Sequence, residues 1–270
     1  MSTDKKYAAA VQMVSTDQLD HNLRQAESLI KIAADKGVQF ILLPENFAFM
    51  GNNTPETISV AEEHGKGKIQ ETISRLAHDL RITIAAGSIP ILDKTGKARA
   101  SCLVYGKDGQ EIARYDKKHL FDVYIKASQE TYRESDTYNP GKNVVVIQTS
   151  IGKVGLSICY DIRFPEMYRE MHEAGVEIII VPSAFTEQTG RVHWEPLLRA
   201  RAVENLCYVI AADQGGVHTN GRKTYGNSMI IDPWGRIKAR LEKGAGVIFS
   251  EIDLDLQKKM REEFPVLLHR

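Results

Sequence analysis

Three residue types that together support nucleophilic attack on a carbonyl carbon occur in this chain beside predicted strands. The first is Cys159, in the segment Val154-Gly-Leu-Ser-Ile-Cys-Tyr-Asp-Ile-Arg-Phe-Pro165. The apolar run before Cys159 predicts a buried strand, and the residues from Pro165 onwards predict a helix with proline in its first turn. Backbone N–H groups surround a side chain at such a bend, and they favour a thiolate and can stabilise an oxyanion.

A cysteine alone is more often a packing residue than a nucleophile, so Cys159 needs a base and an electrophilic partner. Glu45 is one candidate, because it directly follows the apolar run Phe40-Ile-Leu-Leu-Pro44. The carboxyl end of a strand is where α/β sheets usually bind ligands. Glu134, in a long polar segment, is a second carboxylate. A solvated loop position is the commoner fate of either glutamate.

Lys117 supplies a cation in the segment Tyr115-Asp-Lys-Lys-His-Leu120. In a strand, alternation places Lys117 and His119 on one face and Lys118 on the other, so only one of the two lysines can face Cys159. We expect Lys118 to be solvated. His119 could instead be the base for Cys159, or it could be a hydrogen-bonded structural residue.

Strands and helices alternate along most of the chain, as in layered α/β proteins. Two halves follow this pattern, separated by a predicted hairpin around residues 106–109 and a polar stretch, 122–143, without a clear period. We therefore expect one α/β domain, residues 1–270, with two sheets packed face to face. The expected strands are 7–14, 40–43, 82–86, 100–105, 110–120, 144–147, 154–158, 177–181, 207–212, 228–232, 236–241 and 246–252. The expected helices are 19–36, 69–80, 166–173, 193–205 and 254–263.

Composition excludes several functional classes. Hydrophobic residues make up 43% of the 270 residues and charged residues 26%, which is ordinary for a globular protein. Lys plus Arg and Asp plus Glu both number 35, so no basic excess argues for binding to nucleic acid or to an anionic membrane. No apolar run is long enough to span a bilayer, and no apolar segment of a signal peptide follows the N-terminus. We expect a cytoplasmic protein.

The three cysteines, Cys102, Cys159 and Cys207, are far apart in the sequence. An odd number of distant cysteines suits thiols in a reducing compartment rather than a disulfide framework. No clustered Cys or His pattern indicates a zinc site, so we expect no metal.

The order Leu-Pro-Glu45, Lys117-x-His-Leu and Cys159-Tyr-Asp-x-Arg-Phe-Pro-Glu resembles the carbon–nitrogen hydrolase (nitrilase) superfamily. The resemblance extends from Ala9 to the C-terminal tail and is most specific around Cys159. It favours the amidase branch, whose members act on deaminated glutathione or alpha-ketoglutaramate, and leans towards the former. Further segments that carry it are Pro182-Ser-Ala-Phe185, His193-Trp-Glu195, Leu198-Arg-Ala-Arg-Ala-Val-Glu204 and Tyr225-Gly-Asn-Ser-Met-Ile-Ile-Asp-Pro-Trp-Gly235.

The resemblance implies a four-layer α-β-β-α sandwich, usually assembled as a homodimer, and catalysis without a metal or an organic cofactor. It implies that Glu45 is the base, Lys117 the catalytic lysine, Cys159 the nucleophile and Glu134 the second glutamate. The N–H of Tyr160 and the ammonium of Lys117 would then stabilise the oxyanion.

The implied reaction is hydrolysis of a small carboxylate-bearing amide to an acid and ammonia, through a thioester on Cys159. Such a substrate needs cationic and hydrogen-bonding groups to hold its carboxylates. Loop arginines and lysines that could do this include Arg222 and Lys223, and the residues that we expect to bind the substrate are Arg163, Phe185, Thr186 and Arg191. The alternatives are an omega-amidase acting on alpha-ketoglutaramate, a nitrilase, a carbamoylase, and a catalytically silent binding protein.

Two segments depart from the family pattern. Arg191-Val192 stands where relatives often have Pro-Ala, and the segment Lys126-Ala-Ser-Gln129 matches poorly. Both bear on the substrate, and the second also bears on the placement of Glu134. We also expect the helix 193–205 to support the pocket or to lie at a subunit interface, with Trp194 as an interface anchor.

Overall fold

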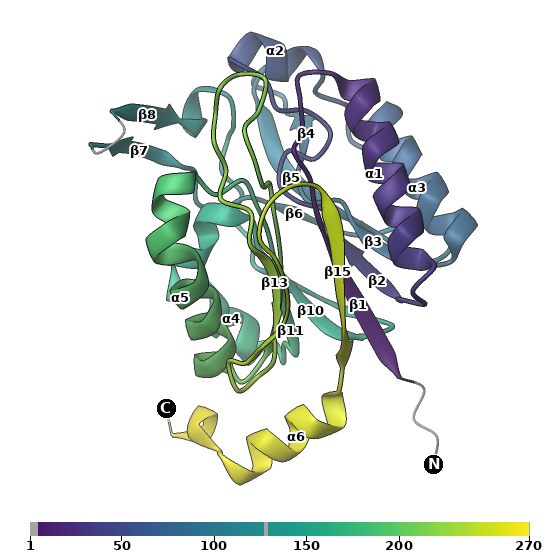
Figure 1. Cartoon of the computed structure of the whole chain (residues 1–270), viewed down its shortest axis with the longest axis vertical. Coiled ribbons are helices and arrows are strands. Elements are labelled where there is room, and N and C mark those ends of the chain that lie inside the picture. The colour runs from purple at the N-terminus through teal and green to yellow at the C-terminus, as the bar shows by residue number, and fades with distance from the viewer. Residues whose placement is uncertain (1–4, 127–128, 270) are drawn as a thin grey trace.

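A computed structural model describes residues 5–126 and 129–269, which form two β-sheets packed face to face between layers of helices (Figure 1). The first sheet has the strand order β15-β1-β2-β3-β5-β4, and β6 also pairs with β5. Its strands are β1 (Lys6–Gln12), β2 (Phe40–Leu42), β3 (Thr83–Ala85), β4 (Ile89–Leu92), β5 (Ala98–Tyr105), β6 (Glu111–Asp116) and β15 (Gly246–Ile252).

The second sheet has the strand order β14-β13-β12-β11-β10-β9, in which the central strands β10, β11 and β12 are parallel. Its strands are β9 (Val145–Thr149), β10 (Gly152–Leu156), β11 (Ile178–Ser183), β12 (Tyr208–Asp213), β13 (Ser228–Ile231) and β14 (Ile237–Leu241). A separate hairpin, β7 (Asp122–Ile125) and β8 (Glu130–Arg133), projects beside these sheets (Figure 1).

Helices cover the outer face of each sheet. Helices α1 (Leu19–Ala34) and α3 (Lys68–Leu80) cover the first sheet, and α4 (Pro165–Glu173) and α5 (Glu187–Asn205) cover the second (Figure 1). This order confirms the predicted α-β-β-α sandwich. The remaining helical segments are α2 (Thr54–Ser59), α6 (Leu254–Glu263) and the 3₁₀ turns η1 (Glu134–Asp136), η2 (Cys159–Arg163) and η3 (Val266–Leu268).

Strand β1 is buried on both faces, which accounts for its continuous apolar run. Ala8 and Ala10 belong to the core shared with the second sheet, whereas Ala9 and Val11 belong to the core beneath α1 and α3. A strand that is buried on both faces needs apolar residues at every position. Small alanine side chains on one face also let β1 lie close to β12 of the facing sheet.

Three predicted segments differ from the structure by more than two residues. The strand expected at 110–120 ends at Asp116, and the stretch 122–143 contains the hairpin β7–β8 and the turn η1. Residues 127–128, in the segment that matches the family poorly, lie outside the described residues. Helix α5 begins at Glu187 rather than at 193, because the Thr186 hydroxyl caps it by accepting a 3.3 Å hydrogen bond from the N–H of Thr189.

The prediction that Trp194 is an interface anchor is wrong. Its side chain is fully buried, and its indole Nε1–H donates a 2.8 Å hydrogen bond to the carbonyl oxygen of Asn227. Its ring also packs on Phe185, with the centroids 4.9 Å apart. Trp194 therefore joins α5 to the second sheet instead of facing a partner.

Candidate active site

Cys159 lies at the bend between β10 and α4. Strand β10 ends at Leu156, and Cys159 begins the 3₁₀ turn η2 with a φ of +48°, in the left-handed region that non-glycine residues rarely adopt. Helix α4 then begins at Pro165, as the sequence predicts. The side chain is 8% exposed. The strained backbone thus presents the thiol at a sharp turn.

Asp161 holds this bend in place. Its carboxylate accepts hydrogen bonds from the N–H of Ile158 at 2.9 Å and from the hydroxyl of Tyr115 at 2.6 Å. It also accepts the backbone N–H of His119 and contacts Nδ1 of the same residue at 2.7 Å. The His119 ring stacks on Phe164 with the centroids 3.7 Å apart. His119 is therefore a structural residue of the turn rather than the base for Cys159.

Glu45 follows β2 and is almost fully buried. Its Oε1 accepts a 2.7 Å hydrogen bond from Lys117 Nζ, and its Oε2 accepts a 2.8 Å bond from the N–H of Ala184. Burial disfavours the ionised form. The charge of Lys117 and a hydrogen bond from the Cys159 thiol nevertheless hold the pKa of Glu45 below its ordinary value. Glu45 is thus an ionised carboxylate beside the thiol.

Lys117 lies just beyond the end of β6, and its ammonium lies between the two carboxylates. Nζ donates to Glu45 Oε1 and, at 2.8 Å, to Glu134 Oε1. Burial opposes its charge, but the two glutamates raise its pKa well above the ordinary value. Gly141 fixes the backbone here: its N–H donates to the carbonyl of Lys117, and a Cβ on it would lie 2.0 Å from the carbonyl oxygen of Asp116.

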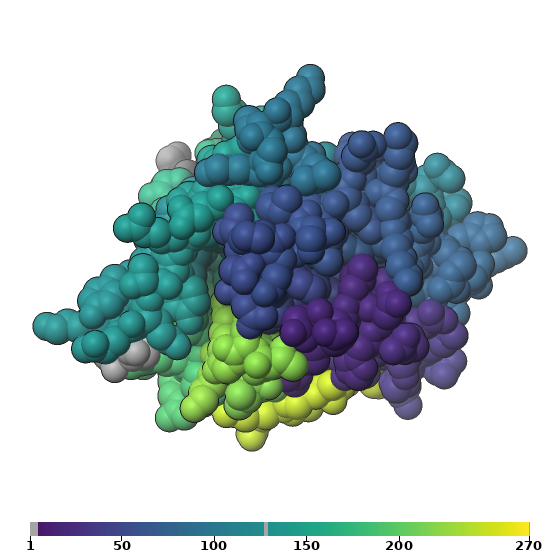
Figure 2. Space-filling view, turned by 90° about the horizontal axis from the view of Figure 1, so that it is seen from above, coloured from purple at the N-terminus to yellow at the C-terminus, as the bar shows by residue number. Residues whose placement is uncertain are grey.

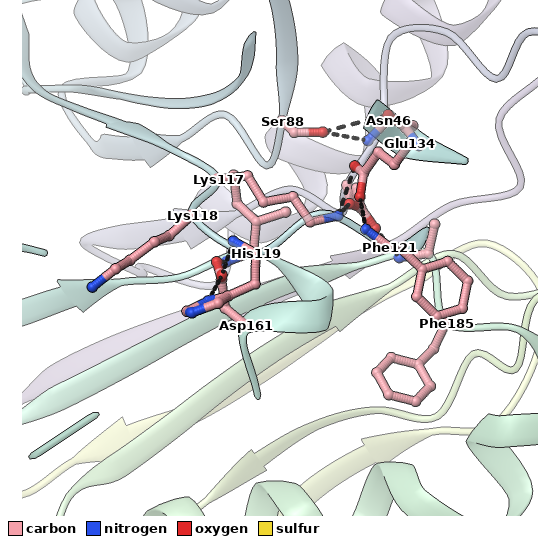
Figure 3. Close-up of polar contacts among 12 residues, drawn as sticks. Asn46, Ser88, Lys117, Lys118, His119, Phe121, Glu134, Asp161 and Phe185 are labelled. Carbon is pink, nitrogen blue, oxygen red and sulfur yellow. Dashed lines mark hydrogen bonds and ion pairs between the residues drawn. The ribbon is translucent and has the colours of Figure 1, made fainter. Parts of the chain in front are cut away.

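Lys118 points the opposite way from Lys117, as Figure 3 shows. Its ammonium is partly exposed and lies 3.9 Å from Glu170. The expected difference between the two lysines is therefore present. Its cause is the chain's exit from β6 and not the alternation of a continuing strand, because β6 has already ended at Asp116.

Glu134 is the first residue of η1, after the hairpin β7–β8. Its second oxygen, Oε2, accepts a 2.6 Å hydrogen bond from the N–H of Phe121 (Figure 3). Burial raises the pKa of Glu134, and the nearby charge of Glu45 adds to this rise despite the attraction of Lys117. Glu134 thus helps to hold the Lys117 ammonium in contact with Glu45.

The state of the Cys159 thiol differs from the expectation. Burial and the negative charge of Glu45 raise its pKa well above the ordinary value, and the nearby N–H of Ala184 and the ammonium of Lys117 offset this only in part. The prediction that backbone donors favour a thiolate is therefore wrong for the free protein. The geometry instead pairs a protonated thiol with an ionised base.

A cavity of about 280 Å³ opens onto Cys159, Glu45, Lys117 and Glu134. The cavity is lined in part by residues 49–54 and 131–134 and by Arg222. The parts of the chain coloured for residues near 50, 130 and 220 meet on the face of the molecule seen in Figure 2. Tyr160 lines the cavity and is the second residue of η2, in the first turn, where backbone N–H groups have no acceptor within the turn. An oxyanion formed at Cys159 could therefore receive the Tyr160 N–H and the Lys117 ammonium.

Three of the expected substrate-binding residues, Arg163, Phe185 and Thr186, line the same cavity. The structure does not bring Arg191 to it. Arg191 is exposed, forms a 2.8 Å ion pair with Glu187 and borders a separate shallow hollow. The reason is that α5 begins six residues earlier than expected, so Arg191 lies on a solvent-facing part of the helix and not in a loop.

Asp213 and Gln214 are polar residues near the site that the sequence reasoning missed. Asp213 Oδ1 accepts the N–H of Phe185 at 2.8 Å, and Gln214 Nε2 donates to the carbonyl of Glu45 at 3.0 Å. Asp213 ends the apolar strand β12 and Gln214 follows it, a position similar to the one that identified Glu45. Within the described residues, no group of His, Cys, Asp or Glu has the geometry to hold a metal ion, and no helix could cross a bilayer.

Comparison with known protein families shows which family this chain belongs to. The family model described as carbon–nitrogen hydrolase matches residues 7–262. The chain belongs to this family. Membership confirms the predicted nitrilase superfamily and the predicted class of enzyme, a carbon–nitrogen hydrolase of the amidase type. A matching curated relative, the deaminated glutathione amidase of Synechocystis sp., is 43% identical over 97% of both chains.

Other relatives of this carbon–nitrogen hydrolase agree. The human deaminated glutathione amidase is 37% identical over 100% of this chain and 83% of its own. The crystal structure of the C. elegans NitFhit protein superposes with a TM-score of 0.92 at 38% identity, and the present chain spans 66% of it. Saccharomyces cerevisiae Nit3, of branch 10 of the nitrilase superfamily, superposes with a TM-score of 0.86 at 31% identity, over 97% and 94% of the two chains.

Proposed function

We propose that this protein hydrolyses a carboxylate-bearing amide, with Cys159 as the nucleophile and Glu45 as the base. The observation that carries the proposal is the buried contact network in which Glu45 meets both the Cys159 thiol and the Lys117 ammonium. A protonated thiol beside an ionised carboxylate is the starting state that general-base activation requires. The cavity above it is large enough for a small substrate.

In the first step, Glu45 takes the thiol proton while Sγ of Cys159 attacks the amide carbonyl carbon. The carbonyl oxygen becomes an oxyanion, which the N–H of Tyr160 and the ammonium of Lys117 stabilise. The protonated Glu45 then gives its proton to the amide nitrogen. The carbon–nitrogen bond breaks, the amine leaves, and a thioester remains on Cys159.

In the second step, Glu45 takes a proton from a water molecule, whose oxygen attacks the thioester carbon. The carbon–sulfur bond breaks, Glu45 returns its proton to the sulfur, and the carboxylic acid leaves. Glu134 keeps Lys117 charged and in position throughout. The sum is one amide and one water converted to one acid and one amine.

Deaminated glutathione is the substrate that we propose, because several relatives carry that name over nearly the whole chain. Glutathione joins the side-chain carboxyl of glutamate to cysteinylglycine through a secondary amide, and it has a carboxylate at each end. Hydrolysis at Cys159 would therefore release cysteinylglycine. The expected release of ammonia from a primary amide applies to alpha-ketoglutaramate, the alternative substrate.

The test is an assay of both amides with the purified protein. We expect a higher kcat/KM for deaminated glutathione, measured by release of cysteinylglycine, than for alpha-ketoglutaramate, measured by release of ammonia. Cys159→Ala should lower turnover by at least about 10³-fold, because it removes the nucleophile. Cys207→Ala, at a buried packing thiol, is the matched control. Turnover by Cys159→Ala at the wild-type rate would refute the mechanism, and a preference for alpha-ketoglutaramate would make the protein an omega-amidase.

We also propose that residues 1–270 form one catalytic domain that acts as a homodimer in the cytoplasm. The three cysteines are buried free thiols, which suits a reducing compartment. Exposed apolar side chains near the end of α5 support self-association.

A further inference from the structure

Arg222, in the loop between β12 and β13, is a half-buried arginine that lines the cavity above Cys159. Its Nη2 donates a 2.7 Å hydrogen bond to the carbonyl oxygen of Ala184. Its guanidinium carbon lies 5.3 Å from the centre of the Tyr132 ring. These two contacts hold the side chain from opposite elements and fix the direction in which the guanidinium points.

The guanidinium of Arg222 has donors that these contacts do not satisfy. Nε is buried and has no hydrogen-bond partner among the described residues. No carboxylate of the described chain forms an ion pair with Arg222 either. Buried donors are normally paired, and an orphan at a functional site calls for an explanation. A planar guanidinium with free donors is suited to bind a carboxylate with two parallel hydrogen bonds.

No carboxylate near the cavity balances the positive charge of Arg222. The ammonium of Lys117 is paired with Glu45 and Glu134. Asp213 is near Arg222, but burial raises its pKa well above the ordinary value, which disfavours the charged form that would compensate the arginine. The Arg222 charge is therefore available to an anionic substrate.

Two further arginines, Arg133 and Arg163, line the cavity without an ion pair to a carboxylate of the described residues, and of these Arg133 is exposed whereas Arg163 is half-buried. The Nη1 of Arg163 contacts Nδ1 of His193 at 3.2 Å, and its guanidinium lies over the rings of Tyr160 and Phe185. One arginine would suffice for a substrate with one carboxylate. The two half-buried arginines, Arg163 and Arg222, instead fit an amide with a carboxylate at each end.

Arg163 and Arg222 are connected to different catalytic groups. Arg163 ends the turn that begins with the nucleophile Cys159. Arg222 bonds to the carbonyl of Ala184, whose N–H bonds to Glu45, and its charge helps to lower the pKa of Glu45. Glu45 delivers the proton to the leaving nitrogen, so Arg222 lies on the side of the departing amine.

We propose that Arg222 binds a substrate carboxylate on the leaving-group side of the scissile amide, while Arg163 faces the acyl side. The inference rests on the proposed amidase function and specifies its substrate class as amides with a carboxylate at both ends. Arg222 would thereby select a peptide-like leaving group over ammonia.

The experiment compares deaminated glutathione with the analogue whose terminal glycine carboxylate is converted to a carboxamide. We expect the wild type to prefer the acid in kcat/KM by about 10–100-fold, as for a charged hydrogen-bonded pair. In Arg222→Gln the preference should fall to within about 3-fold, chiefly through KM. Arg222→Lys keeps the charge but lacks the planar guanidinium, so its preference for the acid should be intermediate between those of the wild type and Arg222→Gln. Because each ratio is taken within one preparation, loss of folded protein cancels.

Lys223→Gln is the matched control, since Lys223 is the neighbouring exposed cation outside the cavity, and it should keep the full preference. An undiminished preference in Arg222→Gln would overturn the proposal. Binding of both compounds to Cys159→Ala and to the double variant Cys159→Ala/Arg222→Gln gives a second readout. If Cys159→Ala binds the acid more tightly than the carboxamide, and the double variant does not, the role of Arg222 is supported. If the wild type nevertheless releases no cysteinylglycine, the proposed function is refuted while this inference stands. Equal binding of acid and carboxamide to Cys159→Ala would refute the inference.

Discussion

The Cys159 thiol is the residue on which the proposed reaction depends, and its protonated state sets how the reaction must begin. Burial and the charge of Glu45 raise its pKa well above the ordinary value, so the neutral thiol persists at physiological pH. The nucleophile therefore forms only as Glu45 takes the proton. This differs from cysteine enzymes in which a neighbouring cation stabilises a resting thiolate.

We expect no thiolate of Cys159 to form between about pH 6 and pH 9. The measurement is the ultraviolet absorbance of the thiolate, taken as the difference between wild type and Cys159→Ala across that range. In Glu45→Gln the pKa of the thiol should fall, because the negative charge that opposes ionisation is gone. A wild-type thiolate signal at neutral pH would contradict the assignment of Glu45 as the base.

Lys117 and Lys118 provide a matched pair of neighbours with opposite surroundings. Lys117→Ala removes the oxyanion donor and should lower kcat by about 10²–10³-fold. It also leaves two buried carboxylates without a counter-charge, which should lower the free energy of unfolding by about 3–5 kcal/mol. Lys118→Ala should change neither quantity measurably. Steady-state kinetics and denaturant unfolding of both variants test this, and the reverse pattern would contradict the placement of the two side chains.

Residue types and strand ends predicted which side chains meet around Cys159, but not every contact among them. Glu45 and Cys159 both mark the ends of apolar runs, a local signal that a sequence carries. Arg191 illustrates the limit. It was expected at the substrate but faces solvent, because the start of α5 depends on the Thr186 cap, which the sequence reasoning did not recognise. The free donors of Arg222 follow from tertiary packing and have no local signal.

At the scale of elements, the end of β12 positions the backbone that holds Glu45. Asp213 Oδ1 accepts the N–H of Phe185, next to the N–H of Ala184 that bonds to Glu45. Burial raises the pKa of Asp213 well above its ordinary value of 3.8, which favours the neutral acid in the folded protein. Asparagine has nearly the same shape and also accepts from the Phe185 N–H.

Asp213→Asn should therefore fold and become more stable relative to wild type as the pH rises. The unfolded chain releases the Asp213 proton near its ordinary value, whereas the folded chain retains it. Stability is then lost with rising pH above about 4, by at most about 1.4 kcal/mol per pH unit. Denaturant unfolding of both proteins across this range gives the difference. A constant difference would mean that Asp213 is ionised in the folded protein. Asp213→Ala should lose about 1–3 kcal/mol at every pH, because the Phe185 N–H loses its acceptor.

The hairpin β7–β8 shows which elements the sequence did not predict. Each of its strands has only four residues, and neither sequence alternates between apolar and polar side chains in the way that identifies a strand. It nevertheless delivers Glu134 to Lys117 through η1. The central strands of both sheets carried a strong signal because they are apolar on both faces, whereas the short buried strand β4 was not predicted.

At the scale of the whole molecule, exposed apolar side chains gather near the end of α5. Val203 is 47% exposed, and a Cβ on Gly235 would contact it. Trp234 is also 47% exposed, and its ring lies 5.7 Å from that of Phe264. Contiguous exposed apolar groups commonly mark an interaction site. These residues, rather than Trp194, are suited to a homodimer interface.

We expect sedimentation to show a dimer at micromolar concentration. Val203→Glu places a charge in the exposed apolar group without disturbing the core, so it should shift the equilibrium towards the monomer by at least about tenfold. Val217→Glu, at an exposed valine in the loop between β12 and β13, is the control and should remain dimeric. A wild type that stays monomeric at this concentration would refute the proposed dimer.

Local patterns predicted the two-sheet sandwich, whereas the order of strands within each sheet was beyond them. Strand β1 pairs with β15, the last strand of the chain, and β5 pairs with β3, β4 and β6. Such partners are chosen by packing across the whole molecule. The family resemblance supplied the layer order that periodicity alone left open.

The contacts of Glu45 also bear on how the protein acquires activity. Its partners Lys117, Ala184 and Gln214 are 72, 139 and 169 residues away in sequence. Contacts that close such long stretches of chain carry a large entropic cost and form slowly. Catalytic activity should therefore appear late in refolding. After dilution from denaturant, far-ultraviolet circular dichroism should recover before turnover does, and a nascent chain should remain inactive until β12 has been synthesised.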